Sequence, residues 1–289
     1  MKIINIIGGL GNQMFQYAFA LFLKSKCVNE EILIDTHHFN HYKLHNGFEL
    51  SNIFKGINIP IANNKQLKKV TRYIPHYQLS RLVRKLLPQL KTEFIENIEY
   101  VYDEKVQNLV GDYYFEGYWQ SHKYYLDIKS DIIKAFEFPK PNNYNEHMAL
   151  EITSSNSVGI HIRRGDYLNH KDFKGICNLD YYHRAINDLL SKSKYYHFYI
   201  FSNDIQWCKE NVQPLINNNK VIYVTENKGK DSFWDMYLMS KCKNLIIANS
   251  SFSWWGAFLN TNVSNIYAPE KWNNKYSVNE IYCPDWIKI

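Results

Sequence analysis

The chain has 289 residues, of which 45% are hydrophobic and 21% are charged, a balance that excludes a disordered protein and allows one large domain or two compact ones. The formal net charge of +6 is small for this length and does not favour a protein that binds nucleic acid. The five cysteines follow neither a CxxC nor a zinc-binding spacing, so we expect reduced thiols and a cytoplasmic protein.

The amino-terminal elements lie in the first 26 residues, MKIINIIGGLGNQMFQYAFALFLKSK. Residues 2–7 predict a strand, residues 8–13 a turn and residues 14–26 a helix with aromatic and aliphatic side chains on one face. The turn lacks the GxGxxG dinucleotide fingerprint, because Met14 stands where the third glycine is required. It also interrupts the apolar run, so we expect neither a cleaved signal peptide nor a membrane span.

The rest of the first half gives weaker signals. Residues 30–35 and 111–119 predict strands, and residues 123–136 predict a helix. Between them, residues 65–91 interleave basic side chains with Leu, Val and Ile at helical spacing. This pattern occurs in segments that contact the inner face of a membrane peripherally. It occurs more often in a solvated helix that packs on its own domain, which is the alternative we favour.

The second half alternates strands and helices regularly after a Pro- and Asn-rich linker at residues 138–145. We therefore divide the chain into an amino-terminal domain, residues 1–140, and a carboxy-terminal domain, residues 141–289. Apolar strands separated by amphipathic helices indicate parallel βαβ units, so we expect an α/β fold with a doubly wound second sheet. The expected strands are residues 157–162, 197–202, 220–226, 244–249 and 265–269, and the expected helices are residues 180–192, 204–212, 231–242 and 252–260.

Ligands of doubly wound sheets bind at the carboxyl ends of the strands, and SVGIHIRRGDYLNH, residues 157–170, places charged residues there. Strand periodicity puts His161 and Arg163 on one face, and Gly165 allows a sharp turn after them. Arginines hold phosphate oxygens through two N–H groups, so Arg163 and Arg164 can bind a diphosphate without a metal. The alternative is an ion pair with Asp166 that only fixes the loop.

Two further segments follow strands at the same predicted edge. FSND supplies a carboxylate that can accept two N–H groups of a guanine, or can simply cap a helix. NSSFSWWGAF places serines at a helix start, where hydroxyl and N–H groups bind phosphate or, again, only cap the helix. The candidate residues are Ser202, Asn203 and Asp204 in the first segment, and Asn249, Ser250, Ser251, Phe252 and Ser253 in the second.

Four motifs in this order, GGLGNQMFQYA, HIRRGDY, FSND and NSSFSWWGA, resemble those of the α-1,2-fucosyltransferase family shared by bacteria and animals. The resemblance implies a GT-B fold, with two Rossmann-like domains whose parallel sheets face each other across a cleft. It also implies GDP-β-L-fucose as the donor, a terminal β-galactose as the acceptor, inversion at the fucose anomeric carbon and no metal. The absence of an Asp-x-Asp sequence agrees with the last point.

The resemblance also implies roles for individual residues. Arg163 holds the diphosphate, His161 lies near the nucleoside and Asp204 reads the guanine. The remaining expected donor contacts are Gly11, Asn12 and Gln13 from the first domain and Arg164, Ser202, Asn203, Asn249, Ser250, Ser251, Phe252 and Ser253 from the second, with Ser250 and Ser251 on phosphate.

The acceptor hydroxyl must lose a proton in the reaction, and the resemblance names no base. Asp166 is the first candidate, because it leaves the same strand end as Arg163; with His161 these residues form the expected catalytic centre. Glu116, His37 and His38 are alternative bases from the first domain, where we also expect the acceptor contacts.

Two other functions remain open. One is a metal-independent GT-B glycosyltransferase that uses a different nucleotide sugar, and the other is a sugar or nucleotide binder without catalysis. If the acceptor were carried on a lipid, a surface contact through residues 65–91 would bring the enzyme to it.

Overall fold

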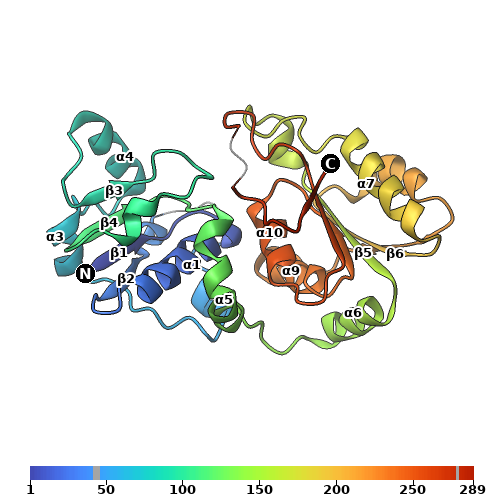
Figure 1. Ribbon diagram of the computed structural model, residues 1–289, viewed down its shortest axis with the longest axis horizontal. Coiled ribbons are helices and arrows are strands. Elements are labelled where there is room, and N and C mark those ends of the chain that lie inside the picture. Colours follow the sequence, from blue (N-terminus) through green and yellow to red (C-terminus); the bar gives the residue numbers. More distant parts are fainter. Residues whose placement is uncertain (42–45, 278–279) are drawn as a thin grey trace. The chain divides into compact units, whose positions relative to one another are not determined.

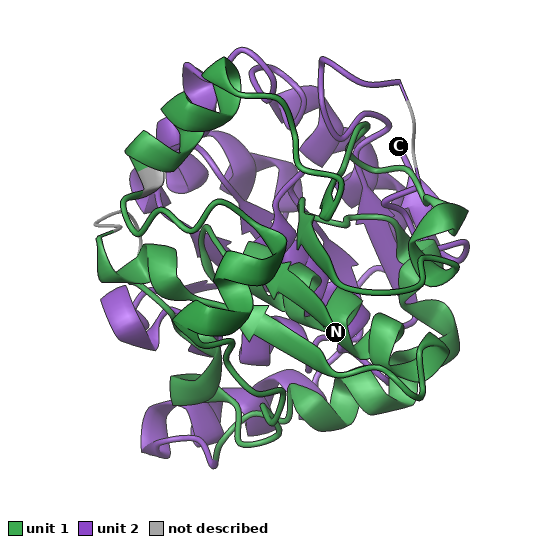
Figure 2. Cartoon of the chain, turned by 90° about the vertical axis from the view of Figure 1, so that its left-hand side faces the viewer, with its two compact units in different colours: residues 1–139 green, residues 140–289 purple. Residues whose placement is uncertain are grey.

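The computed structural model describes residues 1–41, 46–277 and 280–289. They form two compact units, residues 1–139 and residues 140–289, which Figure 2 shows in different colours. The boundary falls within the segment 138–145, where proline and asparagine predict a linker. Asn142 ends this linker by capping the next helix, since its side chain accepts a hydrogen bond from the N–H of Asn145 at 2.9 Å.

Unit 1 contains a four-stranded sheet in which every neighbouring pair is parallel, in the order β2-β1-β4-β3 (Figure 1). Its strands are β1 (Lys2–Asn5), β2 (Ile32–Asp35), β3 (Glu93–Ile95) and β4 (Tyr113–Glu116). Its α-helices are α1 (Leu10–Lys26), α2 (Leu50–Ile53), α3 (Asn64–Val70), α4 (Tyr77–Leu86) and α5 (Lys129–Ala135), with short 3-10 helices at His37–Asn40, Glu104–Gln107, His122–Tyr124 and Leu126–Ile128.

Helices cover both faces of this sheet. On one face, Phe19 of α1 stacks on Trp119 with ring centroids 4.1 Å apart and meets Phe115 of β4 edge-on at 5.6 Å. On the other face, Tyr114 of β4 packs in a buried cluster with Leu67 of α3. Adjacent residues of β4 thus serve opposite faces, as strand geometry requires.

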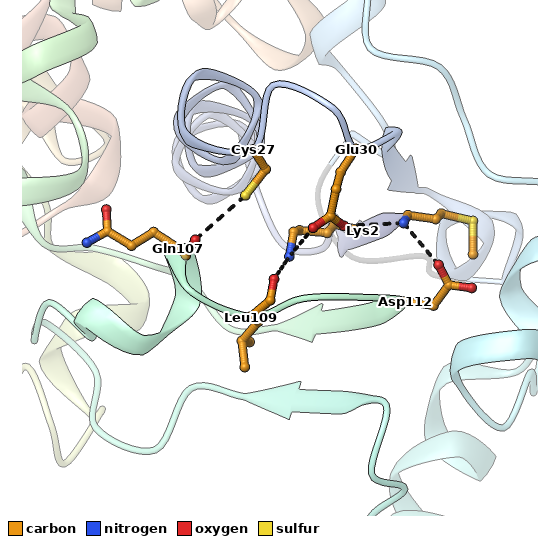
Figure 3. Close-up of polar contacts among 7 residues, drawn as sticks. Lys2, Cys27, Glu30, Gln107, Leu109 and Asp112 are labelled. Atoms are coloured by element: carbon orange, nitrogen blue, oxygen red, sulfur yellow. Dashed lines mark hydrogen bonds and ion pairs between the residues drawn. The ribbon is translucent and has the colours of Figure 1, made fainter.

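The amino end of β1 is fixed by a buried lysine and by ion pairs of the terminal amino group (Figure 3). Lys2 is fully buried; its Nζ donates to the carbonyl oxygen of Leu109 at 2.5 Å and lies 3.3 Å from Glu30 Oε1. The terminal amino group of Met1 pairs with Glu30 and with Asp112 at 3.3 and 3.0 Å. A buried ammonium without partners would lower the stability of the fold. Lys2 must therefore keep its contacts with Leu109 and Glu30, and this fixes the position of β1.

Unit 2 contains a six-stranded parallel sheet in the order β10-β9-β8-β5-β6-β7. Its strands are β5 (Ser157–Ile162), β6 (His197–Ser202), β7 (Lys220–Val224), β8 (Asn244–Ile246), β9 (Asn265–Ala268) and β10 (Ile287–Lys288). Its α-helices are α6 (Asn143–Ser154), α7 (Leu179–Lys192), α8 (Ile205–Trp207), α9 (Phe233–Met239) and α10 (Ser251–Phe258); 3-10 helices span Gly165–Leu168, Gln213–Ile216 and Gly229–Asp231, and a π-helix spans Cys208–Val212.

The strand order places a topological switch point between β5 and β8. From β5 the chain runs outward to β6 and β7, and then returns to the other side of β5 as β8. All six residues of β5 are buried, and Val158, Ile160 and Ile162 share one core cluster with Tyr181 of α7. The predicted alternation along this strand is therefore confirmed, and the switch point marks the edge where ligands of such sheets bind.

Some element boundaries differ from those predicted. Helix α1 begins at Leu10, so residues 11–13 lie in its first turn and not in a loop. The helix predicted over residues 204–212 changes to a π-helix after Trp207 and ends in a 3-10 turn that contains Pro214, which has no N–H to continue the α-helical ladder. The strands β3 and β10 were not predicted, because three and two residues are too few for a periodic signal.

Candidate functional site

Polar residues gather where β5, β6 and β8 end in unit 2. Ile162 and Ser202 are neighbours at the ends of β5 and β6, and Ile160 pairs with Ile246 of β8. The loops that carry HIRRGD, FSND and NSSFS therefore leave the same edge of the sheet. The structure thus brings together the three segments that sequence analysis selected in the second domain.

Arg163 lies at this edge with its guanidinium oriented by an acidic partner. Its Nε and Nη2 donate to the two carboxylate oxygens of Asp166 at 3.0 and 3.2 Å, and the guanidinium carbon lies 5.6 Å from the ring centroid of Tyr167. The Nη1 group takes no part in this pair. The ion pair predicted as an alternative is therefore present, and it fixes one edge of Arg163 while the side chain stays partly exposed.

Arg164 is held on the opposite side of the loop. Its Nε donates to Asp204 Oδ2 at 3.0 Å, and its guanidinium lies 4.0 Å from the ring centroid of Trp207. Its backbone N–H donates to Asn203 Oδ1 at 3.0 Å. The ion pair, the cation–π contact and the backbone hydrogen bond all connect Arg164 to residues 203–207, so Arg164 links the loop after β5 to the loop after β6.

Asp204 has local partners for both of its carboxylate oxygens. One accepts from Arg164, and the other accepts from the N–H of Trp207 at 3.2 Å, which makes Asp204 the cap of α8. Ser202 Oγ in turn accepts from the N–H of Asp204 at 3.0 Å. The helix-cap interpretation of FSND is therefore realised, and the guanine contact expected of Asp204 stays a prediction.

Gly165 allows the two loops to approach closely. Its φ of +43° lies in the left-handed region, and a Cβ there would lie only 2.7 Å from Asn203 Nδ2. A side chain at this position would be strained by the backbone and would displace the Asn203 amide. The glycine in HIRRGD is thus explained by the position of Asn203.

His161 is a buried, neutral imidazole at the end of β5. Burial, together with the nearby charge of Arg163, lowers the pKa of His161 to about 3. Its ring centroid lies 5.9 Å from that of Phe252, and among the described residues its Nδ1 has no hydrogen-bond partner. A neutral ring with an uncommitted nitrogen can bind a ligand, but it cannot supply positive charge at neutral pH.

The start of α10 forms the other side of this site. Ser250 caps the helix by accepting from the N–H of Phe252 at 3.3 Å, and its side chain also interacts with that of Tyr167. Asn249 is committed to the fold, since its Oδ1 accepts from Cys177 Sγ and its Nδ2 donates to the carbonyl oxygen of Trp272. The first-turn N–H groups of a helix are suited to anions, so this part of the segment fits the predicted phosphate contact.

Ser253 and Ser251 differ in this segment. Ser253 is fully buried, and its hydroxyl donates to the carbonyl oxygens of Ala248 and Ser250 at 3.0 and 3.3 Å. Ser251 is half-buried at the first position of the helix. The structure therefore gives Ser253 a role in the fold, and the donor contacts expected of this segment stay predictions.

In unit 1, Gln13 is occupied within the fold. Its Nε2 donates to the carbonyl oxygens of Gly8 and Gly47 at 2.9 and 2.8 Å, and its Oε1 accepts from the N–H of Glu49 at 2.9 Å. It therefore ties the loop before α2 to the start of α1, and the donor contact expected of Gln13 stays a prediction. Asn12 is half-buried, and its Oδ1 accepts from Gln120 Nε2 at 3.0 Å, while Gly11 is buried beside it.

The acceptor candidates of unit 1 lie at the carboxyl ends of β2 and β4. Glu116 forms an ion pair with Arg84 of α4. His37 Nδ1 lies 2.5 Å from Asp35 Oδ1, and Asp35 Oδ2 accepts from the hydroxyl of Tyr114 at 2.8 Å. His37 Nε2 lies 3.2 Å from the carbonyl oxygen of Ile74, so both ring nitrogens face acceptor oxygens and neither is open to take a proton.

His38, next to this group, is buried, and burial lowers its pKa to about 4. It is therefore neutral at pH 7. Within the part of the chain that the structure describes, no group of three or more His, Cys, Asp or Glu side chains could hold a metal ion. In that same part, no helix combines the length and apolarity that a membrane crossing requires.

Sequence reasoning missed three partners of these side chains. Trp207 follows Asp204 by three residues. At this spacing the side chain of a helix cap accepts from a backbone N–H, so the FSND motif could have predicted this contact. Tyr167 ends the HIRRGDY motif, but its contacts with Arg163 and Ser250 depend on the fold. Arg84 gave no signal toward Glu116, because the two residues lie 32 positions apart.

Comparison with known proteins gives a consistent picture. The family model described as glycosyl transferase family 11 matches residues 1–289. An α-1,2-colitosyltransferase of Escherichia coli is 32% identical over 99% of this chain and 98% of its own, and the O-antigen biosynthesis glycosyltransferase WbnK of Escherichia coli is 30% identical over 98% of each. Galactoside α-(1,2)-fucosyltransferase 2 of Hylobates lar is 25% identical over 90% of this chain and 69% of its own.

Solved structures share the fold. The crystal structure of NodZ α-1,6-fucosyltransferase soaked with GDP-fucose aligns over 92% of this chain and 93% of that chain, with a TM-score of 0.50 and 14% identical residues. At this level of identity the similarity speaks for the fold alone. It confirms the predicted α/β fold of the GT-B class, with one parallel sheet in each unit.

Proposed function

We propose, from the premise that the chain belongs to glycosyl transferase family 11, that this glycosyltransferase moves L-fucose from GDP-β-L-fucose to a sugar hydroxyl. The acceptor in this proposal is the 2-hydroxyl of a terminal β-galactose in an oligosaccharide, such as a repeat unit of a surface polysaccharide. The reaction inverts the anomeric carbon and needs no metal.

The observation that carries the proposal is the position of Arg163 at the switch point of unit 2. Its guanidinium is oriented by Asp166 and lies 5.6 Å from the ring centroid of Tyr167, whose side chain interacts with Ser250 at the start of α10. A forked cation and helix N–H groups on one sheet edge match the two phosphates of a nucleoside diphosphate.

These groups favour the departure of GDP. When the bond between fucose and the diphosphate breaks, negative charge builds on the outer phosphate while the sugar becomes cation-like. A fixed guanidinium stabilises that developing charge more than it stabilises the bound substrate, which lowers the barrier. The neutral His161 can donate or accept a hydrogen bond in this site without adding charge.

Asp166 suits a positioning role better than that of the base. Both of its oxygens accept from Arg163, so removing a proton from the acceptor would break the pair that orients the cation. In unit 1, both ring nitrogens of His37 face acceptor oxygens, Asp35 Oδ1 and the carbonyl oxygen of Ile74, so His37 would have to lose the Ile74 contact before it could take a proton. Glu116 is paired with Arg84, and we therefore assign the base to none of these groups.

The relatives support this assignment and add one alternative. The Hylobates lar relative is a galactoside α-(1,2)-fucosyltransferase, and NodZ was soaked with GDP-fucose. The Escherichia coli relative at 32% identity is an α-1,2-colitosyltransferase, which favours colitose as the second candidate sugar. Both alternatives keep the α-1,2 linkage.

The test offers both donors to the purified protein. GDP-fucose and GDP-colitose are each supplied with a panel of β-galactosides, with and without EDTA, and the product linkage is determined by NMR. The proposal expects α-1,2-linked fucose in the presence of EDTA. Transfer from GDP-colitose alone would assign the second candidate, and nucleotide binding without any transfer would reduce the protein to a binder.

A further inference from the structure

Helix α4, labelled in Figure 1, has a row of solvent-exposed leucines. Leu79, Leu82 and Leu86 are 50%, 53% and 73% exposed, and spacings of three and four residues place them in one stripe along the helix. Ser80, in contrast, is buried. An amphipathic helix of a soluble domain usually packs its apolar face on the core. In α4 the apolar face is the exposed one.

An ion pair holds the helix in this orientation. Arg84 pairs with Glu116 at the end of β4, and its guanidinium carbon lies 6.0 Å from the ring centroid of Tyr114. Arg84 stands between Leu82 and Leu86 in the sequence, on a different side of the helix. Anchoring Arg84 on the sheet therefore turns the leucine stripe outward.

The exposed apolar side chains are concentrated here. Among the described residues, thirteen large apolar side chains are exposed, and four of them fall in residues 79–87. Single exposed leucines need no explanation, but a clustered stripe marks a contact surface.

Positive charge is concentrated around the same helix. Residues 65–91 contain eight Lys and Arg and no Asp or Glu, so the net charge of +6, less this +8, leaves −2 for the rest of the chain. Lys85 is exposed on α4 and Lys91 is exposed just after it. Arg72 Nη1 donates to the carbonyl oxygen of Pro88 at 2.8 Å, which brings a guanidinium to the carboxyl end of the helix.

We propose that α4 and the basic residues around it form a docking surface for an anionic lipid bilayer. The leucine stripe enters the boundary between headgroups and acyl chains, and the flanking cations contact the lipid phosphates. An apolar stripe bordered by cations, in a segment without Asp or Glu, matches that layered surface better than it matches a protein partner. The surface belongs to unit 1 and uses none of the residues assigned to the donor, so its test is independent of the proposed function.

The experiment is flotation of the purified protein with vesicles of phosphatidylcholine, with or without phosphatidylglycerol. Wild-type protein floats with the anionic vesicles, and floats less at high salt because the charges are screened. Replacing Leu79, Leu82 and Leu86 together by serine lowers the bound fraction about tenfold, since three apolar side chains no longer enter the bilayer. The matched control replaces three exposed apolar residues elsewhere, Val28, Val110 and Leu150, by serine and still floats.

A second pair of variants tests the charges. Lys69→Gln, Lys85→Gln and Lys91→Gln together lower binding to anionic vesicles, whereas Lys55→Gln, Lys194→Gln and Lys271→Gln together do not. The melting temperature of each variant, and its hydrolysis or transfer of donor with a soluble acceptor, verifies the fold. The proposal is overturned if wild-type protein fails to float, or if the leucine variant floats as well as its control. It is equally overturned if light scattering shows a dimer that the leucine variant abolishes while vesicles bind neither protein.

Discussion

Replacing Arg163 by lysine keeps the positive charge but removes the forked guanidinium. In the structure, Nε and Nη2 bind the oxygens of Asp166 at 3.0 and 3.2 Å, and Nη1 lies outside that pair. A lysine has one ammonium group, which can serve Asp166 or a phosphate but cannot reproduce both contacts. We expect turnover to fall about 100-fold, a loss of about 3 kcal/mol in transition-state stabilisation.

The same substitution should leave the fold intact. The side chains of Arg163 and Asp166 are 39% and 61% exposed, and an ion pair in that setting contributes about 0–1 kcal/mol to stability. The melting temperature of Arg163→Lys should therefore stay close to that of the wild type. A loss of activity can then be attributed to the site.

A matched control lies in the same unit. Arg184 pairs with Asp180 through Nε at 3.0 Å, and these side chains are similarly exposed, at 46% and 69%. Steady-state kinetics at saturating donor and acceptor, with calorimetric titration of GDP, should show the loss in Arg163→Lys and wild-type values in Arg184→Lys. Wild-type turnover and GDP affinity in Arg163→Lys would refute the assignment of the diphosphate site.

Three other expectations concern the backbone, a buried histidine and metal. Gly165→Ala should lower the free energy of unfolding in urea by about 1–3 kcal/mol, because φ is +43° and the new Cβ would meet Asn203. The control Gly175→Ala has a φ of +77° and open space around it, so it should lose less stability. Equal losses in the two variants would exclude a close approach of Gly165 to Asn203. His161 has a pKa lowered from 6.5 to about 3, so its contribution to stability is present above pH 6.5 and is lost as the pH falls toward 3. The stability advantage of the wild type over His161→Gln should shrink by about 2 kcal/mol between pH 7 and pH 5, and a constant difference would mean that the histidine is not buried in its neutral form. Transfer should continue in EDTA, and a loss that Mn²⁺ restores would contradict the metal-free mechanism.

Local patterns in the sequence were sufficient to predict much of unit 2. The alternation in SVGIHI assigned Val158, Ile160 and Ile162 to one face, and they share one core cluster. Ser250 caps α10 as a serine at a helix start should. These features depend on residues within a few positions of one another, which is why periodicity and capping rules find them.

Contacts between distant segments decided what the sequence left open. Whether Asp204 pairs with an arginine depends on the pairing of β5 with β6, which sets it beside Arg164, 40 residues earlier. Gln13 is occupied by a loop 34 to 36 residues away. The orientation of α4 depends on the ion pair between Arg84 and Glu116. Glu116 lies outside residues 65–91, so the helical pattern of that segment could not predict the orientation.

We propose that this chain forms an α-1,2-fucosyl linkage, and determining the structure of the product tests this proposal without intermediate steps. Purified protein is incubated with GDP-fucose and a β-galactoside, and the product is analysed by two-dimensional NMR. We expect one new fucose in α linkage at the 2-hydroxyl of galactose. A product linked at another hydroxyl, a β-linked fucose, or transfer from GDP-colitose but not from GDP-fucose would contradict it.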